Sequence, residues 1–135
     1  MRPRASLILI AEQEVLLIYR ENAKGTYYVL PGGKVEEGET PAEAASRELI
    51  EEAGIKVDIV KELGEFMDTT IDHHVYFLSG RLIGEKVTPE WQEKDKQTAD
   101  NIYRFEWCKA EKIETINLLP ELVKSKIISE LSFLS

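Results

Sequence analysis

The chain has 135 residues, of which 43% are hydrophobic and 31% are charged, and this composition excludes a disordered chain. The 25 acidic residues outnumber the 17 basic ones, so the net charge of -8 argues against binding nucleic acid through a basic surface. A single cysteine excludes an internal disulfide, and no apolar stretch has the length of a signal peptide or a membrane span. We expect one domain over residues 1–135, located in the cytoplasm and without a membrane partner.

Short segments rich in apolar, β-branched or aromatic residues predict six strands. They cover residues 6–11, 15–19, 26–30, 56–66, 74–82 and 102–108. The first two form a hairpin, and residues 21–25 are expected to be a loop. Gly64 marks a bulge in the fourth strand. The polar segment 84–101 is predicted to be a long loop, of the length that is typical of a functional lid or a mobile insert.

The clearest helix signals lie between Thr40 and Gly54. Thr40 suits the N-cap, Pro41 suits the first helical position, and Glu43 completes a capping box. Gly54 suits the left-handed residue that ends a helix. These signals predict a helix over residues 41–53. On a helical wheel, one sector is expected to pack against the sheet, and its members are Ala42, Ser46, Leu49 and Ala53.

A second helix is predicted over residues 120–134, because its apolar residues recur at helical spacing. The residues of its expected buried stripe are Leu122, Ile127, Leu131 and Leu134. Several strands with two helices at separate places in the chain predict an α/β layered domain.

Glu48, Glu51 and Glu52 share a sector about 100° wide on the first helix. A solvated helix face is one interpretation. However, like charges at this spacing repel each other, and the helix dipole disfavours anions in the last turn, where Glu51 and Glu52 lie. A bound divalent cation would reverse the sign of both terms. Carboxylates without His or Cys partners favour Mg²⁺, with Mn²⁺ as the alternative, over zinc.

The spacing of residues 33–55 is more specific than any of its parts. Gly33 is followed by five residues, then Glu39, seven residues and the segment from Arg47 to Ile55, which reads RELIEEAGI. This segment resembles the Nudix box at every defined position. The resemblance implies an α/β/α sandwich with a mixed β-sheet and a catalytic loop-helix-loop. It also implies hydrolysis of a nucleoside diphosphate linked to another moiety.

The same resemblance implies roles for individual residues. Four would hold the metal, the first through its carbonyl: Gly33, Glu48, Glu51 and Glu52. Arg47 would orient these carboxylates and pair with Glu39. Glu51 would help to deprotonate the attacking water, unless that role falls to an acid in the long loop, where Glu90 and Glu93 are the candidates.

The substrate is less defined by the sequence. Tyr28, Lys34 and Trp91 are candidates to contact it, because aromatic rings can stack on a base. The alternative is that Trp91 anchors its loop to the domain and that Tyr28 packs against the domain, which is the favoured interpretation for Tyr28. For a short domain we expect a nucleoside triphosphate pyrophosphohydrolase, by analogy with the family. The alternatives are a nucleotide sugar or dinucleoside polyphosphate hydrolase, an enzyme acting on an RNA 5′ end, and a non-catalytic nucleotide-binding sensor. The partner would be a small nucleotide-like molecule, and the first hairpin or the final helix would supply the interface of a homodimer.

Overall fold

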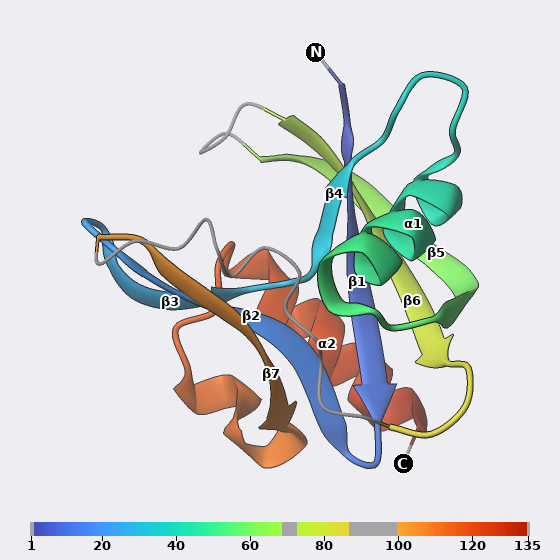
Figure 1. Cartoon of the computed structure of the whole chain (residues 1–135). Helices are drawn as coiled ribbons and strands as arrows, with labels where there is room; N and C mark the ends of the chain where they lie inside the picture. Colours follow the sequence, from blue (N-terminus) through green and yellow to red (C-terminus); the bar gives the residue numbers. More distant parts are fainter. Residues whose placement is uncertain (1, 69–72, 87–99, 135) are drawn as a thin grey trace.

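The computed structural model describes residues 2–68, 73–86 and 100–134 of the chain (Figure 1). The first half of the chain forms the strands β1 (Arg4–Ala11), β2 (Glu14–Asn22), β3 (Gly25–Val29) and β4 (Gly32–Lys34), followed by helix α1 (Pro41–Ala53). The second half forms β5 (Val57–Asp68), β6 (His73–Leu82), β7 (Ile102–Lys109), the 3₁₀ helix η2 (Ala110–Thr115) and helix α2 (Leu122–Leu134). No helix in the described residues is both long and apolar enough to cross a bilayer.

The strands form a mixed sheet in the order β3-β2-β1-β6-β5, with β4 paired to β1 and β7 paired to β2. The pair β1–β6 is parallel and the other pairs are antiparallel. One edge of β1 is shared, since β4 pairs with residues 4–6 and β2 only with residues 10 and 11. The β2–β3–β7 part of the sheet therefore diverges from β1 and β4, as Figure 1 shows.

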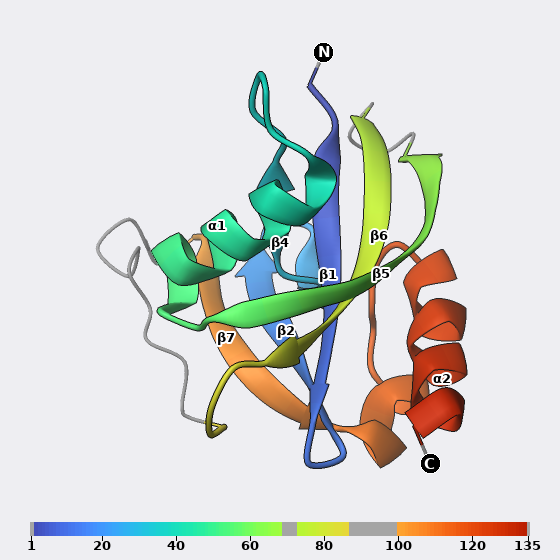
Figure 2. The same ribbon diagram turned by 90° about the vertical axis from the view of Figure 1, so that its right-hand side faces the viewer.

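Helices cover both faces of this sheet, with α1 on one side and α2 on the other (Figure 2). Successive residues of β1 point to opposite faces, so Leu7 and Leu9 pack with α1 while Ile8 packs with α2. A strand covered on both faces needs apolar residues in succession, which explains the uninterrupted run in β1. The predicted α/β/α sandwich with a mixed sheet is confirmed.

Helix α1 covers the predicted residues 41–53, and the predicted capping box of Thr40 and Glu43 is present. Gly54 ends the helix in the left-handed conformation, with a φ of 68°. The predicted packing sector is partly right, because Leu49 and Ala53 are buried whereas residues 42 and 46 are only half-buried. Two further residues are buried: Ala44 and Ala45.

The structure corrects several predictions made from local sequence. Residues 21, 22 and 25 belong to strands instead of a loop, because the β2–β3 ladder continues to its two-residue turn at Ala23 and Lys24. Strand β4 and helix η2 were not predicted. The three residues of β4 have no preference for a strand and adopt one because the edge of β1 supplies hydrogen-bond partners. The bulge at Gly64 is confirmed by a register shift between Glu62 and Gly64.

Helix α2 begins at Leu122, two residues later than predicted, and its predicted buried stripe is partly right, because Leu131 packs partly buried against the core. Ile127 is buried as expected, but Leu122 is 44% exposed and Val123 is buried in its place. Glu130 is also buried on this face, and its carboxylate lies 3.4 Å from Nζ of Lys61 on β5. The helix is therefore rotated so that residues 123, 127 and 130 face the sheet.

Candidate functional site

The glycine segment and the glutamate helix are in direct contact. A Cβ added to Gly33 would lie 2.4 Å from Cδ of Glu48, which is closer than real Cβ atoms come to other heavy atoms. Position 33 therefore accepts only glycine while Glu48 keeps this place. Strand β4 carries Gly33 and α1 carries Glu48, and the antiparallel pairing of Gly33 with Ala5 of β1 fixes the glycine next to the helix.

Arg47 joins the carboxylates of this segment. Its Nε and Nη2 donate to the two oxygens of Glu39 at 2.7 and 3.0 Å, a bidentate pair. Its Nη1 lies 3.1 Å from Oε1 of Glu48 and 3.2 Å from Oε2 of Glu51. Nη2 also donates to the carbonyl oxygen of Lys34 at 3.1 Å. One guanidinium therefore ties the loop before α1 to two of the three helix glutamates.

These contacts shift the ionisation of both partners. The hydrogen bond from Arg47 lowers the pKa of Glu39 to about 2, and the backbone N–H of Glu36 adds to this effect. The pKa of Arg47 is raised, chiefly by the hydrogen bond to Glu39 and then by that to Glu48, while burial opposes the rise. Glu39 therefore stays ionised through the whole physiological range.

The donor set of this segment fits a hard divalent cation. Arg47 reaches one oxygen of Glu48 and one of Glu51, so the second oxygen of each remains for a cation. Helix α1 has no basic residue in its last turn, where the helix dipole disfavours the negative charges of Glu51 and Glu52. Among the described residues, however, no three His, Cys, Asp or Glu side chains are close enough to hold one ion. Cation binding would therefore need these side chains to draw together.

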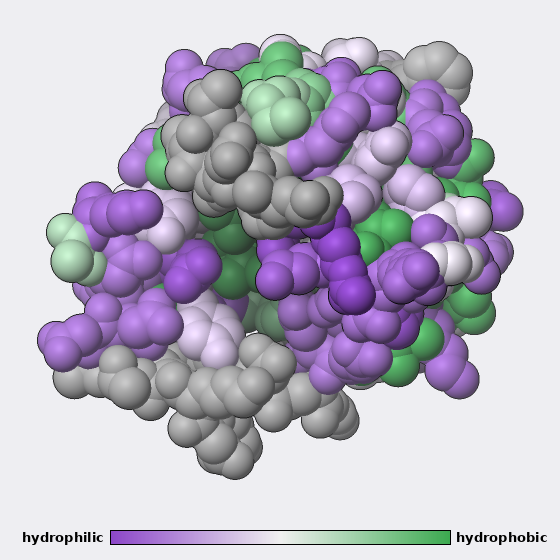
Figure 3. Space-filling model, turned by 90° about the horizontal axis from the view of Figure 1, so that it is seen from above, coloured by the Kyte–Doolittle hydropathy of each residue, from purple (hydrophilic) through white to green (hydrophobic). Residues whose placement is uncertain are grey.

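A cleft of about 750 Å³ opens where the β2–β3 hairpin diverges from β1. Its lining residues are Arg4, Ser6, Arg20, Lys24, Tyr27, Val29, Leu30, Phe66, Val75, Phe77, Asn117, Leu119, Pro120 and Val123. Seen from above, the surface is hollowed near its middle, with hydrophobic residues deep in the hollow and hydrophilic residues around it (Figure 3). The cleft borders the segment that contains Gly33, because Arg4 pairs with Lys34 and Ser6 with Gly32.

The structure places Tyr28 away from this cleft. Its hydroxyl donates to Oε2 of Glu106 at 3.1 Å, and burial and the Glu106 charge raise the pKa of Tyr28 to about 12. Tyr27, on the opposite face of β3, lines the cleft instead. Lys34 is exposed, and its described contact is through its carbonyl oxygen.

Sequence reasoning missed Tyr27 and the basic residues of the cleft. The alternation of side chains along a strand could have separated Tyr27 from Tyr28. No local signal identified Arg4, Arg20 or Lys24, because they are brought together by the fold. Three predicted residues lie outside the described part of the chain: Glu90, Trp91 and Glu93.

Comparisons with known proteins show the family to which the chain is similar. A family model described as NUDIX domain matches residues 1–128. Diphosphoinositol polyphosphate phosphohydrolase 2 of Rattus norvegicus is 35% identical over 101 residues, which are 74% of this chain and 52% of that protein. Oxidized purine nucleoside triphosphate hydrolase of Danio rerio is 40% identical over 76 residues, 48% of each chain. The chain thus spans about half the length of these relatives.

Solved structures agree on the fold. The crystal structure of a NUDIX family hydrolase from Clostridium perfringens superposes with a TM-score of 0.75. The superposition covers 99% of this chain and 98% of the other at 16% sequence identity.

Proposed function

The chain belongs to the NUDIX domain family, and we propose that it hydrolyses a diphosphate linkage in a nucleoside diphosphate derivative with the help of a divalent cation. Members of this family generally use such cations. The observation that carries the proposal is the contact between Gly33 and Glu48. It places the backbone of Gly33 next to a carboxylate of α1, on a helix face that also bears Glu51 and Glu52.

Glu48 and Glu52 would be the main ligands of the cation, with Glu51 and the Gly33 carbonyl in support. When bound, the cation would lower the pKa of the attacking water and neutralise negative charge on the leaving phosphate. Arg47 holds Glu48 and Glu51 in place from one side, which orients their remaining oxygens toward the site. Its bidentate pair with Glu39 fixes the guanidinium itself.

Glu51 would accept the proton of the attacking water, because its side chain is 58% exposed and lies beside Glu48 and Glu52 on the same face. The water oxygen forms a bond to one phosphorus of the diphosphate, and the bridging P–O bond breaks. For a nucleoside triphosphate, the two products are a nucleoside monophosphate and pyrophosphate. Glu93 and Glu90 remain the alternative proton acceptors proposed from the sequence.

The nucleoside part of the substrate would occupy the adjacent cleft. Apolar residues such as Phe66, Phe77 and Leu119 suit the face of a nucleobase, and Tyr27 lies at the wall. A nucleoside triphosphate is the substrate class that we favour among those proposed from the sequence, and the similarity to an oxidized purine nucleoside triphosphate hydrolase supports it.

The test is a substrate panel scored by product masses in ¹⁸O-labelled water, which identifies the phosphorus that is attacked. The panel contains nucleoside triphosphates, nucleotide sugars, dinucleoside polyphosphates and diphosphoinositol polyphosphates, each with Mg²⁺ or Mn²⁺. We expect hydrolysis of at least one class, and its loss when a chelator is added. Binding without any metal-dependent hydrolysis across the panel would contradict the proposal and support a nucleotide-binding sensor.

A further inference from the structure

The cleft beside the proposed metal site collects positive charge in an acidic protein. The chain has 25 acidic and 17 basic residues, yet the residues that line the cleft include Arg4, Arg20 and Lys24, and none of these described lining residues is Asp or Glu. Cationic side chains that line one cleft, with no carboxylate among its described lining residues, repel one another. A ligand with negative charge in the cleft would remove that repulsion.

Arg20 has an unused donor in this cleft. Its Nε is buried and has no hydrogen-bond acceptor in the part of the chain that the structure describes. Its Nη2 donates to the amide oxygen of Asn101 at 3.2 Å, and its Cζ lies 5.7 Å from the ring centroid of Tyr103. These neutral contacts hold the guanidinium in place without neutralising it. An anionic acceptor would satisfy Nε with a charge-assisted hydrogen bond.

Arg20 and Lys24 lie on the wall of the cleft that is remote from the glycine segment. Strand β2 joins β1 only near Val15, and beyond this junction the β2–β3 hairpin that carries Arg20 diverges from β1 and β4 (Figure 1). Lys24 lies further still, in the turn at the tip of the β2–β3 hairpin. Gly33 lies next to the opposite wall, which Arg4 and Ser6 of β1 line, because β4 pairs with this part of β1. A diphosphate held at Gly33 and Glu48 would therefore leave Arg20 and Lys24 for a different anionic group.

The apolar side chains in the cleft indicate which class of ligand can bind there. Its apolar side chains are Leu30, Phe66, Val75, Phe77, Leu119 and Val123. Such a surface suits a nucleobase, whereas a fully phosphorylated polyol has no apolar face to place on it.

We propose that, within the nucleoside triphosphate class favoured above, the preferred substrate carries a further phosphate on its ribose, at the 2′ or 3′ position, in addition to the scissile diphosphate. Arg20 and Lys24 bind this ribose phosphate, and the base lies on the apolar floor. The inference rests on the proposed function for the identity of the reaction, but the binding that it describes does not depend on hydrolysis.

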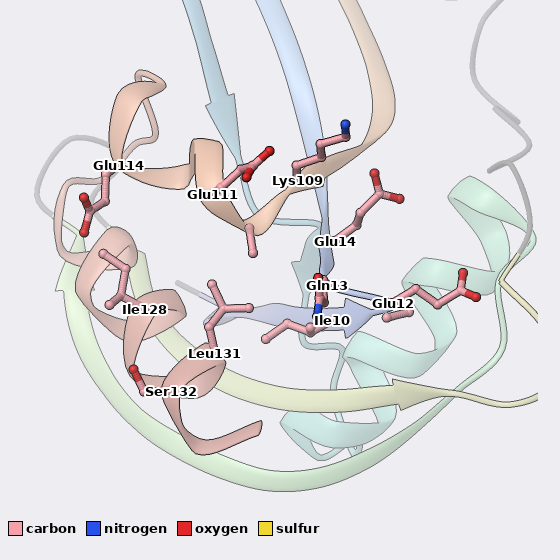
Figure 4. A pocket seen from close by; sticks show the side chains of 12 residues that line it. Ile10, Glu12, Gln13, Glu14, Lys109, Glu111, Glu114, Ile128, Leu131 and Ser132 are labelled. Atoms are coloured by element: carbon pink, nitrogen blue, oxygen red, sulfur yellow. The ribbon is translucent and has the colours of Figure 1, made fainter. Parts of the chain in front are cut away.

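A second large cavity among the described residues has the opposite charge. It lies between the β1–β2 turn, η2 and α2, and its lining includes Glu12, Glu14, Glu111 and Glu114 with Lys109 (Figure 4). Its carboxylates would repel a phosphate, so the two cavities are not interchangeable sites for the same ligand.

Equilibrium binding tests the inference without catalysis. The ligands are adenosine 3′,5′-bisphosphate, adenosine 2′,5′-bisphosphate and adenosine 5′-monophosphate, measured by calorimetry on the full chain without added metal. We expect at least one bisphosphate to bind about tenfold or more tightly than the monophosphate, as one charge-assisted hydrogen bond would give. In Arg20→Gln the preference should fall to about twofold or less, while affinity for the monophosphate changes little.

Two variants make the outcome specific. Arg81→Gln removes the same charge from an exposed position of β6 outside the cleft, and it should keep the preference. Lys24→Gln changes an exposed turn residue and should lower the preference even if Arg20→Gln fails to fold. Equal affinity of the wild-type chain for bisphosphates and monophosphate would overturn the inference. It would also be overturned if Arg20→Gln weakened all three ligands equally, or if inositol hexakisphosphate outcompeted every nucleotide. Binding preference without hydrolysis of any substrate would instead contradict only the proposed function.

Discussion

Gly33 and Glu48 are in contact across the junction of β4 and α1, such that a side chain at position 33 would overlap the carboxylate of Glu48. We therefore expect Gly33→Ala to displace Glu48 and to lower the rate of metal-dependent hydrolysis by about a hundredfold or more, as for the loss of a metal ligand's support. Initial rates at saturating Mg²⁺ would measure this. Gly25→Ala is the control, because Gly25 has a φ of 109° but open space around it, so it introduces backbone strain away from the site. Equal rates for Gly33→Ala and the wild-type chain would show that hydrolysis does not depend on the position of the Glu48 carboxylate next to residue 33.

Arg47 acts on the proposed metal ligands through a planar, five-donor group that lysine cannot imitate. Arg47→Lys loses the bidentate pair with Glu39 and cannot hold Glu48 and Glu51 at the same time. We expect the Mg²⁺ concentration for half-maximal activity to rise about 10- to 100-fold. Arg104→Lys is a matched control, since Arg104 forms its ion pair with Glu106 instead. An unchanged Mg²⁺ requirement in Arg47→Lys would mean that the guanidinium does not orient the ligands.

Glu39 makes stability depend on pH in a defined window. Its pKa is lowered from an ordinary 4.5 to about 2 in the folded chain by Arg47. A carboxyl group with a lower pKa in the folded state contributes stability that is fully present above its unfolded pKa and is lost as the pH falls through the folded pKa. The difference in Tm between the wild-type chain and Glu39→Gln should thus be constant above about pH 5 and shrink from there toward about pH 2.

Thermal unfolding of the two proteins at several pH values measures this difference. Glu37→Gln serves as the control, because Glu37 is exposed and has no ion-pair partner in the described residues. Its difference from the wild-type chain should not follow the same profile. A Glu39→Gln difference that is independent of pH between about 2 and 5 would argue against a strong Arg47–Glu39 pair in solution.

The buried face of α2 predicts unequal effects of two similar substitutions. Ile127 is fully buried, whereas Leu122 is 44% exposed. Ile127→Ala should lower the free energy of unfolding by roughly 2–5 kcal/mol, because it leaves a cavity against the sheet. Leu122→Ala should change it by no more than about 0.5 kcal/mol. Chemical denaturation of both variants tests this, and similar losses would mean that α2 packs with the face expected from the sequence.

Helix α1 and its cap could be predicted because their signals are local. Thr40, Glu43 and Gly54 act within one turn of the helix ends, so no distant contact is needed to read them. The resemblance of residues 33–55 to a known motif located the glutamates of the proposed site for the same reason. Strand β4, in contrast, forms only because β1 lies beside it.

The buried face of α2 and the residues of the cleft could not be predicted from short stretches of sequence. Apolar residues at both 122 and 123 allow two helix orientations, and the sheet surface decides between them. The cleft joins Arg4 of β1, Arg20 of β2 and Val123 of α2, which are distant in sequence. Tyr27 and Tyr28 are neighbours in a strand and therefore lie on opposite faces, but only the pairing of β3 with β2 decides which of them faces the cleft.

The most direct test of a metal-dependent hydrolase is the turnover of Glu52→Gln on the best substrate of the panel, beside Glu43→Gln. Both variants remove one negative charge from α1, but glutamine at position 43 can still complete the capping box. We predict that Glu52→Gln lowers kcat at least about a hundredfold while Glu43→Gln stays within about twofold of the wild-type chain. Wild-type turnover in Glu52→Gln would contradict the assignment of the helix glutamates to a catalytic cation.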